Sequence, residues 1–275
     1  MEVFLYNNFN RKFAKDFWLL FAAVILIIVL SFICGSFTPY DPHALKTGGL
    51  LEPPGIKHIF GTDDHGRDVL SRVLAGSRTS ILSSIILVLL SCTFGTALGV
   101  ICGYFGGLID IILMRINDIF LAFPGMILAV AIAGLLGGGL FNALIAIFVT
   151  SWTQYARLAR SQTMVQKEEA FVHAAKLSGC SDINIMFVHI LPNIISTLIV
   201  TAAMNVSVAM MGIAGLSFLG FGVKIPHAEW GSMISEGKKY LQTAPWMALA
   251  PAGVMVFVMI IFNLFGEKLR DILAA

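Results

Sequence analysis

The sequence predicts an all-α membrane protein that crosses the bilayer several times and is surrounded by membrane lipid. Hydrophobic residues make up 57% of the 275-residue chain, while charged residues make up only 12%. Soluble proteins carry about 25% charged residues, so a soluble chain of this composition would expose large apolar patches. The uncharged segments are also long enough for bilayer crossings, each of which needs about 20 apolar residues. Composition and segment length therefore point to the same polytopic helical class.

The uncharged segments predict six transmembrane helices. Residues 119–156 are too long for one crossing and contain the glycine-rich stretch 134–139, where we expect two helices to meet. The other four crossings are expected at residues 17–33, 80–109, 190–223 and 240–266. An uncleaved first helix is favoured over a secretory signal, because no A-x-A cleavage site follows it. We expect residues 1–79 to form a cytoplasmic stub, a first helix and an external loop, followed by a core at 80–271.

Six crossings place both termini on one side of the membrane, and the basic residues favour the cytoplasmic side. With the termini inside, ten of the 18 Lys and Arg residues lie in inner segments. The others are mostly in two long outer loops, which carry less weight. The inner loops also lack an acidic residue near Arg157 and Arg160 that would balance their charge. The expected protein is a multi-pass protein of the plasma (inner) membrane, and its net charge of +2 is too small to indicate nucleic-acid binding.

A short polar segment, residues 157–189, separates two of the longest uncharged stretches. Its small residues would let a helix pack closely on another surface, and a glycine suits the end of that helix. Ser181 can cap a following helix, and a proline is tolerated in the first turn of the next span. The segment is either a docking site for a soluble partner or an ordinary cytoplasmic loop. The residues singled out here are His173, Ala174, Ala175, Gly179, Asp182 and Pro192.

This segment resembles the EAA loop of ABC importer permeases, whose pattern is E-A-A-x3-G-x9-I-x-L-P, with His173 at the position of the glutamate. Residues 61–68 resemble the G-T-D-x-x-G-R-D signature of dipeptide, oligopeptide and nickel permeases. Residues 216–223, followed by 229–231, resemble the L-S-F-L-G-x-G-V…E-W-G segment of the same permeases. Three motifs in the right order make the resemblance specific. The residues of the external signature are Gly61, Thr62, Asp63, Gly66, Arg67 and Asp68.

The resemblance implies a type I ABC importer permease fold, in which this chain forms half of a translocation pathway. It implies four kinds of neighbour: a second homologous permease, two ATPase subunits, an external substrate-binding protein and lipid. Residues 173–182 would then couple the chain to an ATPase subunit. The chain itself would have no catalytic residues and bind no cofactor, because ATP and Mg belong to the ATPase subunits. Consistently, the stretch 231–239 lacks the spacing of a phosphate-binding loop.

The substrate and the pathway residues are predicted from shorter stretches of sequence than the family is. Residues 177–179, 214–217 and 228–231 look more like the nickel branch, so nickel or a metal chelate is predicted, with dipeptides or oligopeptides as the alternative. No fixed metal site is predicted. Within the fifth span, polar or sulfur-bearing side chains would either line the pathway or pack between helices. A receptor of another class and an ion-coupled transporter stay as alternatives, although the latter would normally need charges inside its spans. The candidate pathway residues are Met204, Asn205 and Met211.

Overall fold

The computed structural model describes residues 2–34, 37–224 and 226–273, with side chains from residue 15 onward. Within these residues every regular element is a helix, which confirms the predicted all-α class. The long helices are α1 (Glu2–Cys34), α2 (Val69–Phe105), α5 (Leu140–Lys167), α8 (Leu191–Phe218) and α10 (Trp246–Leu273). The shorter elements are α3 (Gly107–Leu121), α4 (Gly125–Leu135), α6 (Ala170–Leu177), α7 (Asp182–Asn184), the π-helical η1 (Ile185–Ile190), α9 (Trp230–Gly237) and the 3-10 turn η2 (Lys238–Tyr240).

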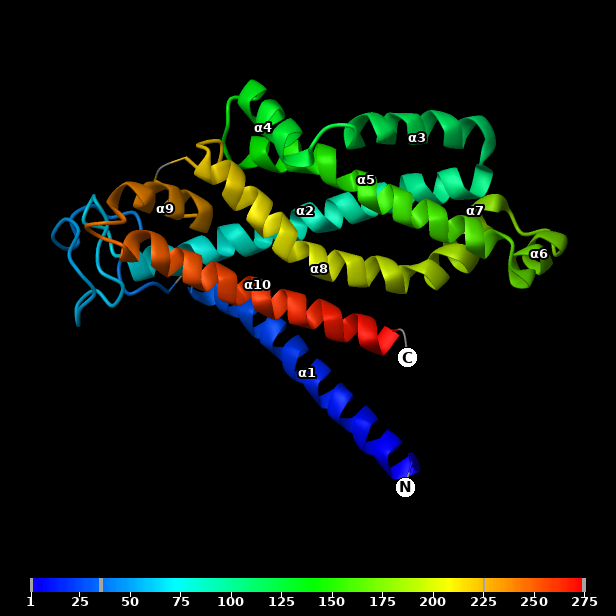
Figure 1. Ribbon diagram of the computed structural model, residues 1–275, viewed down its shortest axis with the longest axis horizontal. Coiled ribbons are helices and arrows are strands. Elements are labelled where there is room, and N and C mark those ends of the chain that lie inside the picture. The colour runs from blue at the N-terminus through cyan, green and yellow to red at the C-terminus, as the bar shows by residue number, and fades with distance from the viewer. Residues whose placement is uncertain (1, 35–36, 225, 274–275) are drawn as a thin grey trace.

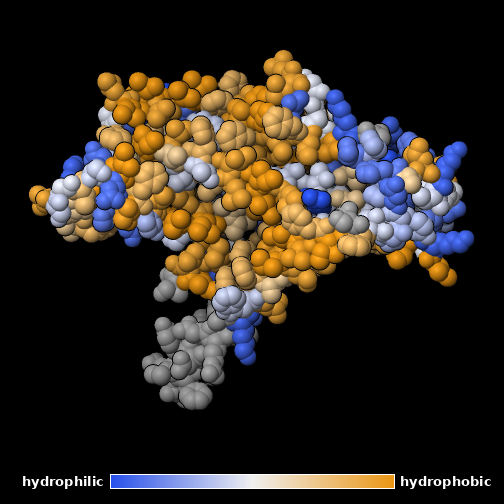
Figure 2. Space-filling model, turned by 180° about the vertical axis from the view of Figure 1, so that it is seen from behind, coloured by the Kyte–Doolittle hydropathy of each residue, from blue (hydrophilic) through white to orange (hydrophobic). Residues whose placement is uncertain are grey.

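The long helices run roughly along one axis of an elongated molecule (Figure 1). The loop 37–68 and α9 gather at one end, which we call the loop end, while α6 and α7 lie at the opposite end, the α6 end (Figure 1). Figure 2 shows a broad apolar surface between two ends where hydrophilic residues collect. This distribution suits a molecule whose middle lies in lipid and whose ends lie in water.

The number of membrane spans is not confirmed as six. Four segments are long and apolar enough to cross a membrane: Lys15–Cys34, Val69–Phe105, Asp182–Phe218 and Trp246–Leu273. Helices α3 and α4 together make a fifth candidate, but they are bent by 87° at a short break. Helix α5 is 28 residues long, yet it is absent from these apolar segments because its sequence is more polar. By length and composition alone, four segments of the described residues qualify as spans, or five if α3 and α4 together form one.

Both predicted ends of the second span, residues 80 and 109, are wrong, because α2 begins at Val69 and ends at Phe105. Helix α2 ends at Phe105, where Gly106 and Gly107 adopt φ angles of 64° and 56°, and α3 begins there. Residues 107–109 therefore belong to α3, and not to the second predicted span. Glycine permits this reversal because it has no Cβ to clash in the left-handed region. The predicted helix junction at residues 134–139 is confirmed, since α4 ends and α5 begins there.

Helices α2 and α5 pack closely along a stripe of three glycines, Gly95, Gly99 and Gly103. A Cβ on any of them would lie 2.7 or 2.8 Å from a Cβ of α5, and as close or closer to an α5 backbone oxygen. The four-residue spacing puts the glycines on one helix face, as in the G-x-x-x-G packing of membrane helices. The spacing was visible in the sequence, but the sequence alone did not show which helix it meets.

Candidate functional site

The predicted coupling segment lies at the α6 end of the molecule (Figure 1). Helix α6 ends where Gly179 adopts a φ of 80°, and the Gly179 and Cys180 amides donate to carbonyls in the last turn at 3.1 Å. Ser181 then caps α7, because its hydroxyl accepts from the Asn184 amide at 3.4 Å. Pro192 lies in the first turn of α8. The predicted local roles of Gly179, Ser181 and Pro192 are thus confirmed.

Helix α6 has a buried face and an exposed face. Val172 and Ala175 are buried in a cluster that includes side chains of α2, α5, η1 and α8. His173 and Ala174 are exposed, and Leu177 is 90% exposed. The buried face fixes α6 to three long helices. The exposed face presents the apolar side chain of Leu177 at the surface of the α6 end.

Asp182 holds the segment onto the helices. The Tyr104 hydroxyl, at the end of α2, donates to Asp182 Oδ1 at 2.5 Å. A hydrogen bond to a charged acceptor is stronger than a neutral one, contributing about 1.5–3 kcal/mol. Of the coupling residues predicted from sequence, Asp182 therefore faces the bundle, whereas His173 and Ala174 face outward.

The two arginines that seemed unbalanced in sequence have acidic partners on α3. Arg160 donates to both carboxylate oxygens of Asp110, at 2.5 and 2.6 Å, and Arg157 donates to Asp118 at 3.2 Å. The expectation that no acid balances them is wrong, because the carboxylates lie 50 and 39 residues earlier in the chain. These pairs connect α3 to α5 near the α6 end.

The external signature forms a compact turn at the loop end. Gly61 and Gly66 adopt φ angles of 71° and 70°, and Thr62 pairs with Asp68 in an isolated bridge. Asp68 caps α2, because its Oδ2 accepts from the Ser71 amide at 2.7 Å. A side-chain cap of this kind satisfies one of the free amides at a helix start. The signature therefore begins α2.

A buried charge network joins the signature to α9. Arg67 donates to Asp63 at 2.5 Å and to Glu236 at 3.2 Å, and Arg72 donates to the same Glu236 oxygen at 3.3 Å. Both guanidinium groups belong to residues that are only 1% exposed. Buried charges are tolerated when they are paired, so the network supports a structural role for the signature. Asp63, Asp64 and His65 lie close enough together to hold a metal ion, but the Asp63 carboxylate is already paired with arginine.

The second motif packs against α2, the helix that the first motif starts. Glu229 caps α9 by accepting from the Gly231 and Ser232 amides at 2.7 and 2.8 Å. The Trp230 indole, 1% exposed, donates to the Val73 carbonyl of α2 at 2.9 Å. The two motifs, far apart in sequence, therefore build one structural unit at the loop end.

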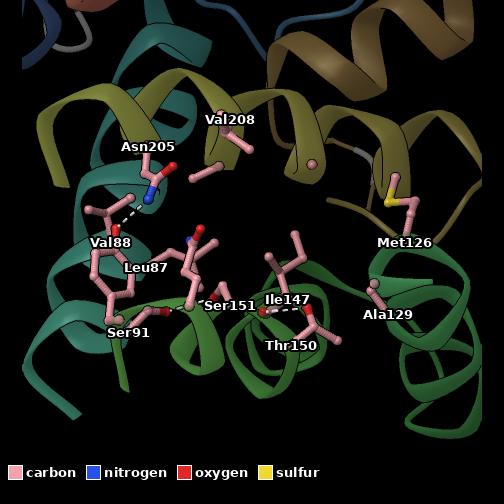
Figure 3. A pocket seen from close by; sticks show the side chains of 15 residues that line it. Leu87, Val88, Ser91, Met126, Ala129, Ile147, Thr150, Ser151, Asn205 and Val208 are labelled. Atoms are coloured by element: carbon pink, nitrogen blue, oxygen red, sulfur yellow. Dashed lines mark hydrogen bonds between the residues drawn. The ribbon is translucent and has the colours of Figure 1, made fainter. Parts of the chain in front are cut away.

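A cavity of about 260 Å³ lies between α2, α4, α5 and α8 (Figure 3). Asn205 points into it, and its amide donates to the Tyr155 hydroxyl at 2.9 Å. The Ser91 and Ser151 hydroxyls pair at 2.8 Å across the α2–α5 contact. Most of the remaining wall is apolar. The signal for these polar residues was their presence within uncharged segments, where polar groups normally face another helix or a cavity.

Asn205 is the one predicted pathway residue that lines this cavity. Met204 instead meets α10, where a Cβ on Gly266 would lie 2.6 Å from its Cγ. Met211 is 64% exposed and does not line the cavity. The two methionines therefore have different surroundings, although both lie on α8. Their predicted pathway role stays a prediction.

Comparison with known proteins gives a consistent family. Residues 95–275 match the binding-protein-dependent transport system inner membrane component family. The chain is 40% identical to the dipeptide transport system permease protein DppC of Haemophilus influenzae, over 91% of this chain and 87% of that protein. It is 39% identical to the probable D,D-dipeptide transport system permease protein DdpC of Escherichia coli, over 94% and 90%. It is 36% identical to the glutathione transport system permease protein GsiD of Pectobacterium atrosepticum, over 98% and 90%.

Among solved structures, the fold is similar to a chain from inward-facing conformations of the MetNI methionine ABC transporter. The TM-score is 0.59 at 15% identity, and the match covers 74% of this chain and 96% of that chain. This likeness supports the type I ABC importer permease fold. Because the family match covers more than half of the sequence and the relatives align over nearly their whole length, this chain belongs to the binding-protein-dependent transport system inner membrane components, the permeases of type I ABC importers.

Proposed function

We propose that this permease subunit carries dipeptides or similar short peptides across the inner membrane as part of an ATP-driven importer. One observation supports a peptide as the substrate. Relatives that align over more than 90% of this chain are named for dipeptide and glutathione transport. The nickel prediction depended on a few short stretches of sequence. It lacks support from these relatives, and the alternative peptide reading is the better one.

The exposed face of α6 supports its role as the docking surface for an ATPase subunit. Leu177 projects into solvent, whereas Val172 and Ala175 are held by the helices behind. A push on Leu177 would therefore move the α6 end of α2, α5 and α8 together, because close-packed side chains transmit displacement rather than absorbing it. His173 stands where the related motif has glutamate, so this docking would rely on apolar contact and not on a salt bridge from that position.

The remaining partners follow from this arrangement. The termini and α6 would face the cytoplasm and two ATPase subunits, which use ATP and magnesium, while the loop end would face an external substrate-binding protein. A second, similar permease would complete the pathway. The chain would act as a pore subunit without chemistry of its own. In alternating access, the helices around the central cavity reorient as the ATPase subunits close, and transport is coupled to that motion.

Transport by the reconstituted complex tests the proposal. The chain is assembled in liposomes with its partner permease, ATPase subunits and binding protein, and uptake of radiolabelled dialanine is compared with uptake of Ni²⁺. We expect ATP-dependent accumulation of dialanine that unlabelled dipeptides compete away, without accumulation of Ni²⁺. ATP-dependent Ni²⁺ uptake in the absence of any peptide uptake would contradict the proposal.

A further inference from the structure

A groove at the loop end, with both polar and apolar lining residues, has no part in the function described so far. Its volume is about 470 Å³, and it lies between the end of α8, the loop that follows and α9. This volume falls within the range of about 300–1,000 Å³ typical of small-molecule sites. The polar and charged side chains that line it are Ser217, Lys224, Ser232, Ser235, Glu236, Lys238 and Lys239.

The groove carries an excess of positive charge. Glu236 is its one acidic lining residue, and that carboxylate is already paired with Arg67 and Arg72 at 3.2 and 3.3 Å. Lys224 and Lys239 are exposed and have no acidic partner within 4.0 Å in the described part of the chain. Because the Glu236 carboxylate is already paired with two arginines, the groove attracts an anion and does not attract an ammonium group.

Lys238 has a structural role that separates it from the other two lysines. Its ammonium donates to the Phe218 carbonyl at 3.4 Å and lies 4.2 Å from the centre of the Phe218 ring. A lysine at this place complements the negative end of α8. Lys224 and Lys239 are therefore the two cations that remain available for a ligand.

Ser217 supplies a second and independent observation. The residue is 3% exposed, and its hydroxyl has no hydrogen-bond partner among the described residues. The bare backbone of Gly222 leaves room for this hydroxyl, since a Cβ there would clash with Ser217 Oγ. Gly220, with a φ of 91°, turns the chain after α8. A buried hydroxyl without a partner is costly, and this one lies in the wall of a cationic groove.

We propose that this groove binds the terminal carboxylate of the incoming peptide, with the ammonium groups of Lys224 and Lys239 as charge partners and the Ser217 hydroxyl as a donor. The proposal rests on the peptide substrate of the proposed function. The Ser217 hydroxyl is buried beneath the Gly222 backbone, so the loop that carries Gly222 has to shift before the carboxylate of a small ligand meets it. The paired state of Glu236 explains why the groove would recognise the acid end of the peptide and not its amino end.

Direct binding to the assembled permease–ATPase complex in lipid nanodiscs, without the binding protein, tests this site. The probe is radiolabelled dialanine, competed with unlabelled dialanine or with its C-terminal amide. We expect saturable binding that the amide displaces at least about tenfold less effectively than dialanine. Because hydrogen bonds to charged groups contribute about tenfold or more in affinity, the Lys224→Gln/Lys239→Gln double variant and Ser217→Ala should both bind more weakly.

Lys57→Gln is the matched control, because Lys57 is an exposed lysine at the same end and does not line the groove. It should bind dialanine like the wild type. Basal ATP hydrolysis, measured on every variant, shows that the complex is assembled. Equal binding by the double variant and the wild type would overturn the site.

The two proposals fail in different ways. If the wild-type complex imports dialanine with its binding protein but shows no saturable binding without it, the groove proposal is wrong and the peptide function stands. The same conclusion follows if the lysine variants instead weaken the stimulation of ATP hydrolysis by loaded and by empty binding protein alike. The lysines would then contact the binding protein and not the peptide. If the wild-type complex imports no dipeptide, the function itself is wrong.

Discussion

The glycine stripe between α2 and α5 predicts a specific cost for adding one methyl group. In Gly99→Ala, the new Cβ would lie 2.8 Å from the Ala159 Cβ and closer still to a backbone oxygen of Ala156. Carbon atoms pack at about 3.5–4.0 Å, so the two helices would have to separate by roughly 1 Å. Overpacking of this kind costs about 1–3 kcal/mol. The flanking glycines, Gly95 and Gly103, would lose their close contacts as the helices separate.

Thermal unfolding of the purified complex in detergent measures this cost. Gly253→Ala is the control, because Gly253 lies within α10 and a Cβ there meets nothing within 4 Å. Alanine also has the higher helix propensity, so the control should be neutral or slightly stabilising. We expect Gly99→Ala to unfold at a lower temperature and to transport less. Equal stability of the two variants would refute the close packing of α2 on α5.

The other predictions concern coupling, the loop end and topology. Leu177→Asp should abolish the stimulation of ATP hydrolysis by loaded binding protein, and it should still fold, because the side chain is 90% exposed. The control Leu177→Met should retain that stimulation. Normal stimulation in the Asp variant would exclude this docking face. Arg67→Met removes a partner from the carboxylates of Asp63 and Glu236 and should lower the stability by about 3–5 kcal/mol. Thermal unfolding measures this loss, and an unchanged unfolding temperature would contradict the charge network. Single cysteines replacing Lys57 and Lys238 should react with an impermeant thiol reagent in intact cells, whereas one replacing Lys167 should not; labelling at Lys167 would reverse the orientation.

Local chemistry explains what could be predicted at the α6 end. Gly179, Ser181 and Pro192 act on the few residues next to them, ending α6, capping α7 and starting α8. Such signals are readable from sequence because both partners lie within one helical turn. Asn205 was found for a related reason, since a polar amide in an apolar helix must face a partner or a cavity. Its partner, Tyr155, lies 50 residues away and was not predictable.

The sequence by itself determined the class of the protein, because a chain so poor in charge has to be solvated by lipid. The family motifs and the ends of several helices were also readable from it. Only the tertiary structure decided the reversal at residues 106–107, because both sides of that break are uncharged. It also decided that Arg160 meets Asp110 and that Arg67 meets Glu236, 169 residues apart. Such pairings depend on which helices lie side by side, and a linear pattern of apolar residues does not specify that choice.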